Sequence, residues 1–398
     1  MSSGSKGAIV ARQTKANGRQ RRNGQKPKHE QLTMMLKLQP FRHILWQMRE
    51  DYTTGRKGYD LKAKFACLLA MHLYNIQCVT RFVAYLRTHV EVREACGISS
   101  LAATPSEDAL YRFRKRMIEG GYATALAQAL VDAAHEQNPD MGKAVAVDST
   151  DVDAWCNKFR SKDRLRDRDA AWGVRLGPTG EHDEKYVGYK LHLMQCVDTE
   201  VPIAWTITAA NAHDSTEALP VFETARSQHD WFKPVYGLMD KGYDSEFIHK
   251  GLEVDFQCHP IIPLRDMRKT KKGILDENGK PYCEGGCWKW IGTDYDRKRS
   301  KWACPMTCSD PKACAGNKAK TCYLNLKDGY RNHSLVPRDT DKFKALYNKR
   351  GAVEREFSRL KDQYMLGSLK VQGIERVRLH FELALIARLG VHLVSNSC

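Results

Sequence analysis

The chain lacks an apolar run long enough to cross a membrane, and its N-terminus lacks the apolar core of a secretion signal. A membrane helix needs about 18 consecutive apolar residues, and no stretch approaches that length. These absences argue against a membrane protein and predict an intracellular one. The 13 cysteines are therefore not expected to form disulfides. No convincing internal repeat is present.

Acidic residues are almost missing from the first 30 positions, where eight Lys and Arg residues accompany Glu30 alone. This segment is rich in Gly, Gln and Asn and has no apolar periodicity, which predicts a disordered basic tail over residues 1–31. The whole chain has a formal charge of +17, so basic residues are also in excess elsewhere. Such an excess favours a polyanion partner, most simply nucleic acid. Mere solubility is the alternative explanation.

Residues 32–140 have apolar side chains at helical spacing, and the 42% apolar content of the chain supports a real core. The segment TPSEDALYRFRKRM predicts a helix with Thr104 as N-cap, Pro105 in the first turn and Glu107 closing a capping box. The far part of this helix is basic and includes Arg112, Lys115 and Arg116. We expect a small helical domain, comparable to a helix-turn-helix, with these residues contacting DNA. An ordinary solvated basic face is the alternative.

After Met141 the pattern changes to short runs rich in β-branched and aromatic residues, which predict strands. The expected strands are AVAVDS (144–149), GYKLHLMQCVD (188–198), PIAWTITAA (202–210), VYGLMD (235–240) and CHPIIPL (258–264). Helices are expected at STEALPVFETARSQ and SEFIHKGLEV, before and after the fourth strand. The fold class is thus α/β, a mixed sheet with flanking helices over residues 141–264. A Cys-rich insertion follows at 265–340, and helical spacing returns over 341–398.

Two aspartates, Asp148 and Asp240, each end an apolar run that is expected to be a buried strand. One such Asp is usually a turn or cap residue. Two of them together with a glutamate on a later helix supply three carboxylates, which can hold a pair of divalent ions for phosphodiester chemistry. Oxygen ligands favour Mg²⁺ or Mn²⁺ over zinc.

The segment LYNKRGAVEREFSRLKDQY contains two candidate glutamates, Glu354 and Glu356. On a continuous helix, with roughly 100° per residue, Tyr347, Arg350, Glu354 and Lys361 fall within an arc of about 60°. Glu356 points almost opposite Tyr347 on such a helix. Glu354 is therefore the predicted catalytic glutamate, and Glu356 is expected to form surface pairs with nearby basic residues.

These features resemble the bacterial DDE insertion-sequence transposases of the group with a Y-x2-R-x3-E-x6-K signature. Here the signature is formed by Tyr347, Arg350, Glu354 and Lys361 with every spacing intact. AVDST resembles the first catalytic aspartate segment of the family and MDKGYDS the second. The segments DAAWGVR, YVGYKLHL and TAANAHDS are similar to those of its central sheet, and residues 60–117, from DLKAKFACLLAMHLYNI through SEDALYRFRKRM, resemble the helical domain often fused to it.

The resemblance implies a ribonuclease-H-like core in which Asp148, Asp240 and Glu354 bind two Mg²⁺ ions. It implies cut-and-paste transposition, in which water cuts the element end and the freed 3′-hydroxyl attacks target DNA. Tyr347, Arg350 and Lys361 would contact DNA near the cleaved phosphate. The partners would be the terminal inverted repeats, target DNA and a second copy of the chain, at the nucleoid in the bacterial cytoplasm. Some members stack a displaced base on an aromatic residue, for which the insertion offers Trp288, Trp290 and Trp302, although these are equally suited to its own core.

The insertion contains two C-x3-C pairs, and these make a candidate zinc site of Cys283, Cys287, Cys304 and Cys308. A cluster of reduced thiols in a small β-rich subdomain is the alternative. Two histidines, His192 and His213, lie in segments that match the family, and we assign them supporting or structural roles.

Two other functions remain open from the sequence. One is a domesticated metal-dependent nuclease without strand transfer, and the other is a DNA-binding protein that has lost catalysis. The presence of Asp148, Asp240 and Glu354 argues against the second.

Overall fold

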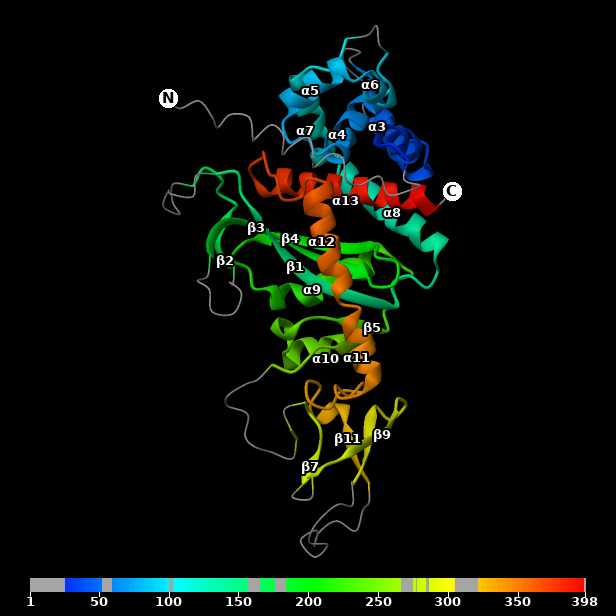
Figure 1. The fold of residues 1–398 in the computed structure, drawn as a ribbon, viewed down its shortest axis with the longest axis vertical. Coiled ribbons are helices and arrows are strands. Elements are labelled where there is room, and N and C mark those ends of the chain that lie inside the picture. The colour runs from blue at the N-terminus through cyan, green and yellow to red at the C-terminus, as the bar shows by residue number, and fades with distance from the viewer. Residues whose placement is uncertain are drawn as a thin grey trace, which may run out of the picture.

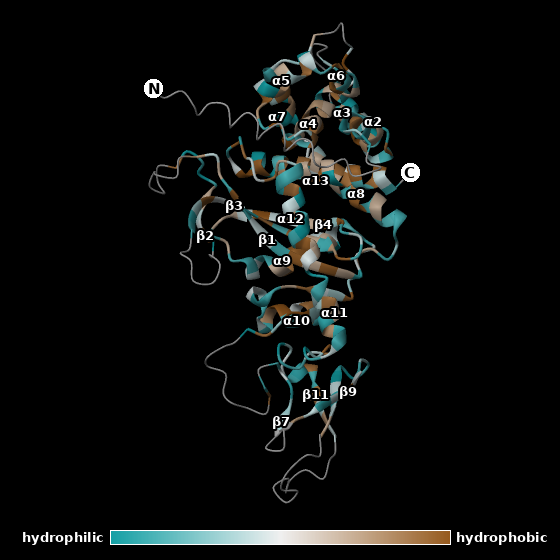
Figure 2. Ribbon diagram, in the orientation of Figure 1, coloured by the Kyte–Doolittle hydropathy of each residue, from teal (hydrophilic) through white to brown (hydrophobic). Residues whose placement is uncertain are grey.

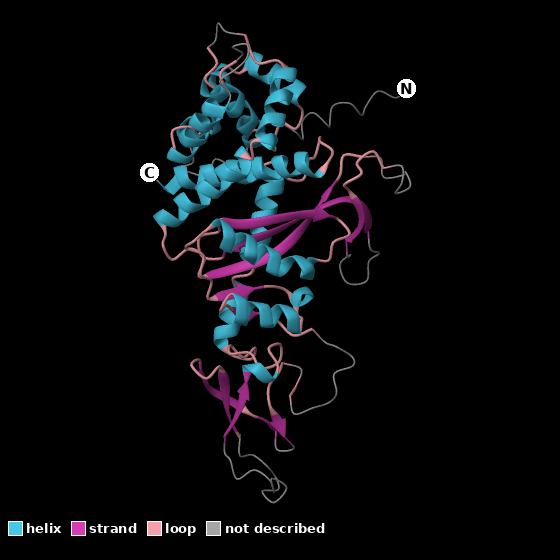
Figure 3. Ribbon diagram, turned by 180° about the vertical axis from the view of Figure 1, so that it is seen from behind, coloured by secondary structure: helices cyan, strands magenta, loops and turns pink. Residues whose placement is uncertain are grey.

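The structure is a computed structural model that describes residues 26–51, 59–99, 103–156, 165–175, 184–265, 275–276, 278–283, 286–304 and 321–396. Three tiers follow one another along the longest axis of the molecule (Figure 1). N-terminal helices form the first tier, a mixed sheet with its helices forms the second, and small antiparallel sheets form the third (Figure 3).

The first tier is helical, as the apolar spacing predicted. Its helices are α2 (Lys28–Met35), α3 (Gln39–Asp51), α4 (Leu61–Leu73), α5 (Val79–Thr88), α6 (Val90–Ala95), α7 (Glu107–Glu119) and α8 (Tyr122–Gln137). Helix α4 is the central one, since all its residues from Phe65 to Leu73 are buried. Helices α5 and α7 each bury one apolar stripe and expose a polar face.

Helix α7 begins later than the sequence predicted. Its N-cap is Ser106, whose Oγ accepts a hydrogen bond from the backbone N–H of Ala109 at 3.3 Å. Thr104 precedes the helix, and the prediction of this residue as the cap was wrong. The side chain of Glu107, the first helical residue, accepts a hydrogen bond from the hydroxyl of Thr80 at 2.7 Å. The error arose because Ser106 offers the same capping chemistry two residues further on.

The second tier contains the sheet. Its strands are β1 (Ala144–Asp153), β2 (Ala171–Arg175), β3 (Glu184–Cys196), β4 (Pro202–Ala209), β5 (Tyr236–Leu238) and β6 (His259–Ile261). They are ordered β2-β3-β1-β5-β6, and β4 also pairs with β3. Strand β1 is antiparallel to β3 and parallel to β5, which in turn is parallel to β6. The five predicted strands are confirmed, and β2 lies within DAAWGVR, which the family resemblance alone assigned to the central sheet.

Helices cover this sheet and connect it to the first tier. They are α9 (Asp214–Gln228), α10 (Glu246–Asp255), α11 (Asp341–Asn348), α12 (Gly351–Gln363) and α13 (Ile374–Asn396), with a short 3₁₀ helix η2 (Lys241–Tyr243) after β5. Helix α9 packs against β4, β3 and β1, and α12 crosses in front of β1 and β3 in Figure 1. The sheet is therefore enclosed between helices, as expected for an α/β protein.

Helix α13 holds the first and second tiers together. It packs against α2, α4, α7 and α8 on the N-terminal side and against β4 and α12 on the sheet side. Hydrophobic residues are concentrated along α8, α13 and the strands (Figure 2). Among the described residues, no helix combines the length and the apolar character that crossing a bilayer would require.

The third tier is built from short antiparallel strands in the Cys-rich insertion. These strands are β7 (Tyr282–Cys283), β8 (Gly286–Cys287), β9 (Lys289–Asp294), β10 (Arg299–Ala303) and β11 (Thr321–Asn325). Trp302 on β10 is only 2% exposed, lies beside Trp290 of β9, and donates its indole N–H to Ser300 at 2.9 Å. Trp288 is also buried. Trp288 and Trp302 thus pack within the insertion, as the structural alternative predicted.

Candidate active site

Asp148, which lies within β1, and Asp240, which follows β5, occupy neighbouring positions where β5 ends. Strands β1 and β5 are parallel, and Ala146 beside Leu238 is the last pair in their register. Each aspartate lies two residues beyond this pair. Since neighbouring strands are about 4.8 Å apart, the register brings the two predicted carboxylates to adjacent positions. Burial along β1 is complete up to Val147 and becomes partial at Asp148, where the strand extends past β5.

Asp240 is fixed by the turn that follows β5. It is the N-cap of η2, and its Oδ1 accepts a hydrogen bond from the backbone N–H of Gly242 at 2.7 Å. A Cβ atom at position 242 would lie only 2.9 Å from Oδ1 of Asp240. A side chain at position 242 would therefore displace the carboxylate of Asp240 from its present position.

The third carboxylate, Glu354, reaches the site from the first turn of α12. The expectation of one continuous helix over the signature was wrong, because α11 ends at Asn348 and α12 begins at Gly351. Arg350 lies at this break as the N-cap of α12. The break moves Tyr347 onto a different helix from Glu354, so the predicted arc of about 60° does not describe the four signature residues.

Arg350 connects two of the three carboxylates. Its Nη1 donates a hydrogen bond to Oδ2 of Asp148 at 3.2 Å, and its Nη2 pairs with Glu354. Although burial opposes a charge at this position, the carboxylates of Glu354 and Asp148 raise the pKa of the guanidinium. Arg350 thus provides a positive charge between Asp148 and Glu354.

The charge state of Asp148 reflects the convergence of acidic groups. Burial raises the pKa of its carboxyl to about 7, and the negative charges of Asp240 and Glu354 act in the same direction. The backbone N–H of Ser149, which donates to Asp148 at 2.8 Å, and the guanidinium of Arg350 oppose the rise. A buried carboxylate next to two others needs cations nearby in order to ionise at neutral pH.

The donor set suits a hard divalent cation, since it consists of three carboxylates. Within the described part of the chain, no group of three or more His, Cys, Asp or Glu side chains is close enough together to hold a metal ion. The guanidinium of Arg350 lies between Asp148 and Glu354, so it must give way before both carboxylates can share one ion. The residues fit such an ion in chemistry and in charge, since they supply oxygen ligands and negative charge.

Glu356 is not a surface residue, contrary to the prediction. Its side chain is fully buried and pairs with Arg359 and with Arg388 of α13, the latter at 3.0 Å between Nε and Oε1. The predicted pairing with basic residues is confirmed, but it occurs in the core between α12 and α13. A single helix projection could not reveal this, because Arg388 is contributed by a helix distant in sequence.

The remaining signature residues flank the carboxylates. The ring of Tyr347 stacks on that of Phe343 with centroids 6.0 Å apart. The guanidinium of Arg350 is 5.8 Å from the ring centre of Tyr347. Lys361, two turns beyond Glu354 on α12, is near the carboxylates of Asp151 and Asp153, although burial is the main influence and lowers the pKa of its ammonium group. Tyr347 and Arg350 are thus close together, whereas Lys361 lies further along β1.

The other predicted residues are found in three places. Arg112 and Lys115 border a cavity at the start of α13, while Arg116 is half-buried on α7. His192 is buried on β3 with Nε2 2.9 Å from the hydroxyl of Thr208, and His213 is the N-cap of α9.

The zinc hypothesis concerns cysteines that the structure describes only in part. Cys287 is exposed on β8 and Cys304 is half-buried after β10. Cys308 and the side chain of Cys283 lie outside the described residues. The zinc site therefore remains a prediction, to be tested by metal analysis of the purified protein.

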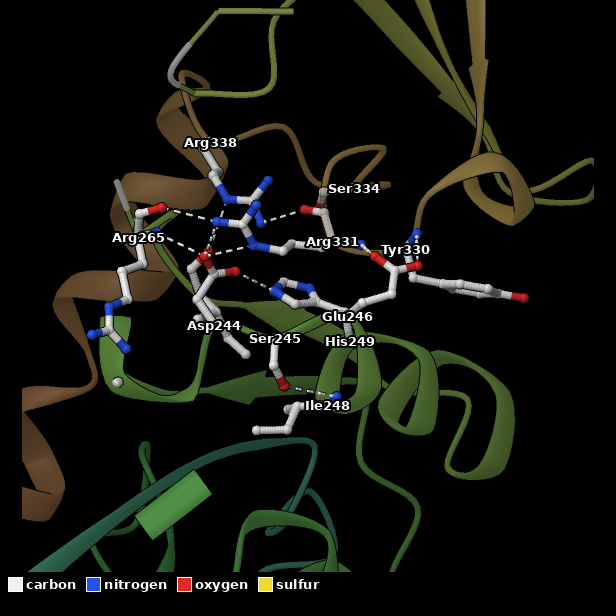
Figure 4. Close-up of polar contacts among 12 residues, drawn as sticks. Asp244, Ser245, Glu246, Ile248, His249, Arg265, Tyr330, Arg331, Ser334 and Arg338 are labelled. Atoms are coloured by element: carbon white, nitrogen blue, oxygen red, sulfur yellow. Dashed lines mark hydrogen bonds and ion pairs between the residues drawn. The ribbon is translucent and has the colours of Figure 1, made fainter. Parts of the chain in front are cut away.

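A buried polar cluster follows Asp240 and was missed from the sequence (Figure 4). At its centre is Asp244, whose side chain is fully buried and accepts hydrogen bonds from Arg331 Nε at 2.9 Å and from the backbone N–H of Arg265 at 2.7 Å. His249 of α10 lies 3.0 Å from its other oxygen. Glu246 accepts from the backbone N–H groups of Tyr330 and Arg331, both at 2.9 Å. This cluster fixes the return segment of the insertion to the turn that carries Asp240.

The sequence shows one member of this cluster, Asp244, as the second aspartate of MDKGYDS. The partner of Asp244, Arg331, is 87 residues away. Arg338 extends the cluster by donating to the backbone carbonyl groups of Ile262 and Arg331. Such long-range pairing cannot be derived from one sequence.

Comparisons with known proteins identify a family. Residues 140–389 match the family described as "Transposase DDE domain", and residues 20–116 match "Transposase domain (DUF772)". A search of curated proteins gave no match. Among solved structures, one similar chain is that of the "piggyBac transposase synaptic complex with hairpin DNA", with a TM-score of 0.46 and 12% identity over 93% of this chain and 75% of that chain.

Proposed function

We propose that this chain, which belongs to the family of transposases with a DDE domain, cuts DNA at the ends of a mobile element and joins the freed ends to target DNA. The observation that carries the proposal is the position of Asp148 and Asp240, each two residues beyond the last pair of two parallel strands. Arg350 links Asp148 to Glu354 at the same place. The intact signature supports membership of the Y-x2-R-x3-E-x6-K group of bacterial insertion sequences, with a ribonuclease-H-like core.

Asp148, Asp240 and Glu354 would hold two Mg²⁺ or Mn²⁺ ions, which supply activation of the attacking oxygen and stabilisation of the leaving oxygen in phosphodiester displacement. Asp148 is held within β1, where it pairs with β3, and Asp240 is held as the cap of η2. Glu354, whose side chain is 57% exposed, is the most exposed of the three and can turn toward the aspartates once Arg350 releases it.

Arg350 would then have two successive roles. Without DNA it neutralises Asp148 and Glu354, and with DNA it turns its guanidinium to the phosphate next to the cut. Tyr347 supports the guanidinium with its ring. Lys361 contacts the DNA backbone at a point further along β1. The signature residues would thus follow one DNA strand.

The other parts of the chain would hold the DNA. The helical domain at residues 32–140 recognises the terminal inverted repeats, with Arg112, Lys115 and Arg116 of α7 among the contacts. The insertion at residues 265–340 lies next to the core and clamps the DNA. Two copies of the chain pair two element ends. The reaction takes place on bacterial DNA in the cytoplasm.

The test uses labelled duplexes that carry the inverted repeats flanking the reading frame, incubated with target plasmid and Mg²⁺ or Mn²⁺. We expect metal-dependent cleavage at the repeat end and joined products. Asp148→Asn, Asp240→Asn and Glu354→Gln should each lower cleavage by at least about 100-fold. The matched controls are Asp140→Asn and Glu223→Gln, because both side chains are more than half exposed and pair with nearby surface cations.

The outcomes separate the alternatives. Cleavage without joined products would indicate a nuclease, and binding without cleavage would indicate a DNA-binding protein. Normal cutting and joining by Asp148→Asn would overturn the assignment of the site.

A further inference from the structure

A cavity of about 750 Å³ lies between the first tier and the core. Its walls come from α7, from the segment that precedes α13 and from Trp155, which follows β1. Its volume is within the range of roughly 300–1,000 Å³ that is typical of sites for small organic ligands. The active site at Asp148 does not contribute to it.

The floor of this cavity is largely apolar and includes one cationic side chain, Arg114 of α7. Leu379 and Leu383 of α13 form part of it, together with His72 and His380. Burial lowers the pKa of His380 to about 4 and that of His72 well below its usual value, so both rings are neutral at physiological pH. His72 is fully buried, and its Nε2 has no hydrogen-bond partner among the described residues. A buried ring nitrogen without a partner, at the floor of a cavity, suits a ligand that can donate or accept a hydrogen bond.

Two aromatic side chains stand at the mouth and are unusually exposed. Trp155 is 51% exposed and Tyr111 of α7 is 49% exposed. The ammonium group of Lys370 lies 5.9 Å from the ring centre of Trp155, and the side chain of Gln372 donates to the backbone carbonyl of Trp155 at 2.7 Å. These contacts hold the indole at the mouth and leave about half of it available for stacking.

The rim is cationic. Arg112, Lys115, Lys370 and Arg376 border the cavity. Its acidic residues are already engaged, since Glu119 pairs with Lys115, Glu375 pairs with Arg378, and Asp169 accepts the backbone N–H of Ile374. A largely apolar floor, exposed aromatic rings and cationic side chains together complement a nucleotide, which combines a flat base with an anionic phosphate.

The cavity also lies along the direction of β1, the strand that carries Asp148. Asp148 and Asp153 are both on β1, and at about 3.3 Å per residue Trp155 is roughly 20 Å from Asp148. Helix α12 packs along β1 and carries Lys361 toward Asp151 and Asp153, after which the chain leads to Lys370. Cations are therefore spaced between Asp148 and the cavity.

We propose that this cavity binds an unpaired nucleotide of a DNA strand that extends from the active site, with the base against Trp155 and Tyr111 and the phosphates at the cationic rim. The proposal rests on the proposed function, because that function is what identifies the strand as DNA from the element end. It assigns Trp155 and Lys370, which are outside the signature, to DNA binding.

The test measures binding without metal, so that it is independent of cleavage. Fluorescence anisotropy in EDTA buffer would compare a labelled blunt duplex, the same duplex with an eight-nucleotide single-stranded overhang, and an oligothymidylate of ten nucleotides. The proteins are wild type, Trp155→Ala, Trp155→Phe, Lys370→Ala and Trp46→Ala. Trp46 is the matched control, because it is 57% exposed on α3 and does not line the cavity.

We expect Trp155→Ala to weaken binding of the oligothymidylate and of the overhang by about 5- to 100-fold, the loss expected for one stacked base, and to leave the blunt duplex unchanged. Trp155→Phe should restore most of the affinity. Lys370→Ala should reduce the slope of log affinity against log salt by about one. Trp46→Ala should bind all three DNAs as wild type does.

Equal affinity of Trp155→Ala and wild type for single strands would overturn the proposal. An equal loss for the blunt duplex would also overturn it, since the cavity would then contact duplex DNA. If micromolar thymidine monophosphate competed as effectively as the oligonucleotide, the ligand of the cavity would be a free nucleotide and not a DNA strand. Asp148→Asn should retain the single-strand preference, so a failure of the cleavage assay and a failure of this cavity are distinguishable.

Discussion

Arg350 donates a hydrogen bond from Nη1 to Oδ2 of Asp148 at 3.2 Å, although the two residues are 202 positions apart. The same guanidinium pairs with Glu354. In this arrangement an arginine side chain occupies the space between two carboxylates and supplies the charge that a divalent ion would otherwise supply. A divalent ion shared by Asp148 and Glu354 would therefore have to displace Arg350.

Replacement of Arg350 by alanine should have opposite effects on metal binding and on catalysis. Mn²⁺ affinity, measured by titration calorimetry without DNA, should rise, because the competing guanidinium is gone. Cleavage of the labelled element end should fall at least about tenfold, because a charge-assisted contact to phosphate contributes about 1.5–3 kcal/mol.

Arg355→Ala is the matched control for this pair of measurements. Arg355 is on the same helix but pairs with Glu200 at the surface, and its side chain is 58% exposed. Both quantities should stay at wild-type values in this variant. Weaker Mn²⁺ binding in Arg350→Ala would show that the guanidinium supports the ion instead of competing with it.

Gly242→Ala should impair catalysis through Asp240. The new methyl group would lie 2.9 Å from Oδ1 of Asp240, so the carboxylate must shift from the position in which the turn now holds it. Cleavage should fall by at least about tenfold while the midpoint of urea unfolding changes little. Gly329→Ala is the control, because a Cβ at that position meets nothing closer than 4.0 Å. Equal activity of the two variants would contradict the role of the turn.

The stability of the protein should depend on the protonation of Glu382. This residue of α13 is buried, and burial raises the pKa of its carboxyl to about 7 from 4.5, against the hydrogen bond from Thr124 of α8. The folded state therefore keeps a proton that the unfolded chain releases. The stabilisation is fully present below pH 4.5 and is lost as the pH rises to 7, which amounts to up to about 3 kcal/mol.

Glu382→Gln should remove this dependence, because the amide is neutral at every pH and still accepts the hydrogen bond from Thr124. Urea unfolding should find the variant more stable than wild type at about pH 8 and nearly equal at about pH 4.5. Glu375→Gln, on the same helix with 55% exposure, should change stability by less than about 0.5 kcal/mol at either pH. A Glu382→Gln variant that is less stable than wild type at the higher pH would contradict a raised pKa of Glu382.

The cluster around Asp244 should determine how firmly the insertion is attached. Arg331→Ala leaves the buried carboxylate of Asp244 without its guanidinium, a change that typically costs about 3–5 kcal/mol. Hydrogen exchange should accelerate in α10 and in residues 329–338, and cleavage should fall because the turn with Asp240 is attached to the same cluster. Arg297→Ala, at a side chain that is 72% exposed, is the control. Unchanged exchange in Arg331→Ala would show that the cluster does not hold the insertion in place.

The part of the fold that could be predicted is the part that depends on local pattern. The apolar run before Asp148 predicted β1, and its counterpart before Asp240 predicted β5, because buried strands need such runs. Strand β2 has only five residues and was assigned to the sheet by the family resemblance of DAAWGVR, not by its own pattern.

What could not be predicted depends on contacts between distant segments. The break between α11 and α12 places Arg350 at a helix start, where its side chain reaches Asp148. The burial of Glu356 depends on Arg388, and the burial of Asp244 depends on Arg331. A helix projection treats each segment by itself, so it grouped Glu354 with the other signature residues but gave the wrong environment to Glu356.

The most direct measurement is the anomalous diffraction of Mn²⁺ in crystals of the protein bound to an element-end duplex. We expect two anomalous peaks about 3.5–4 Å apart, with oxygens of Asp148, Asp240 and Glu354 within about 2.5 Å of them and Arg350 turned toward the DNA. Peaks at other side chains, with Arg350 still paired to Asp148 while the DNA is cut, would contradict a two-metal site formed by these three carboxylates.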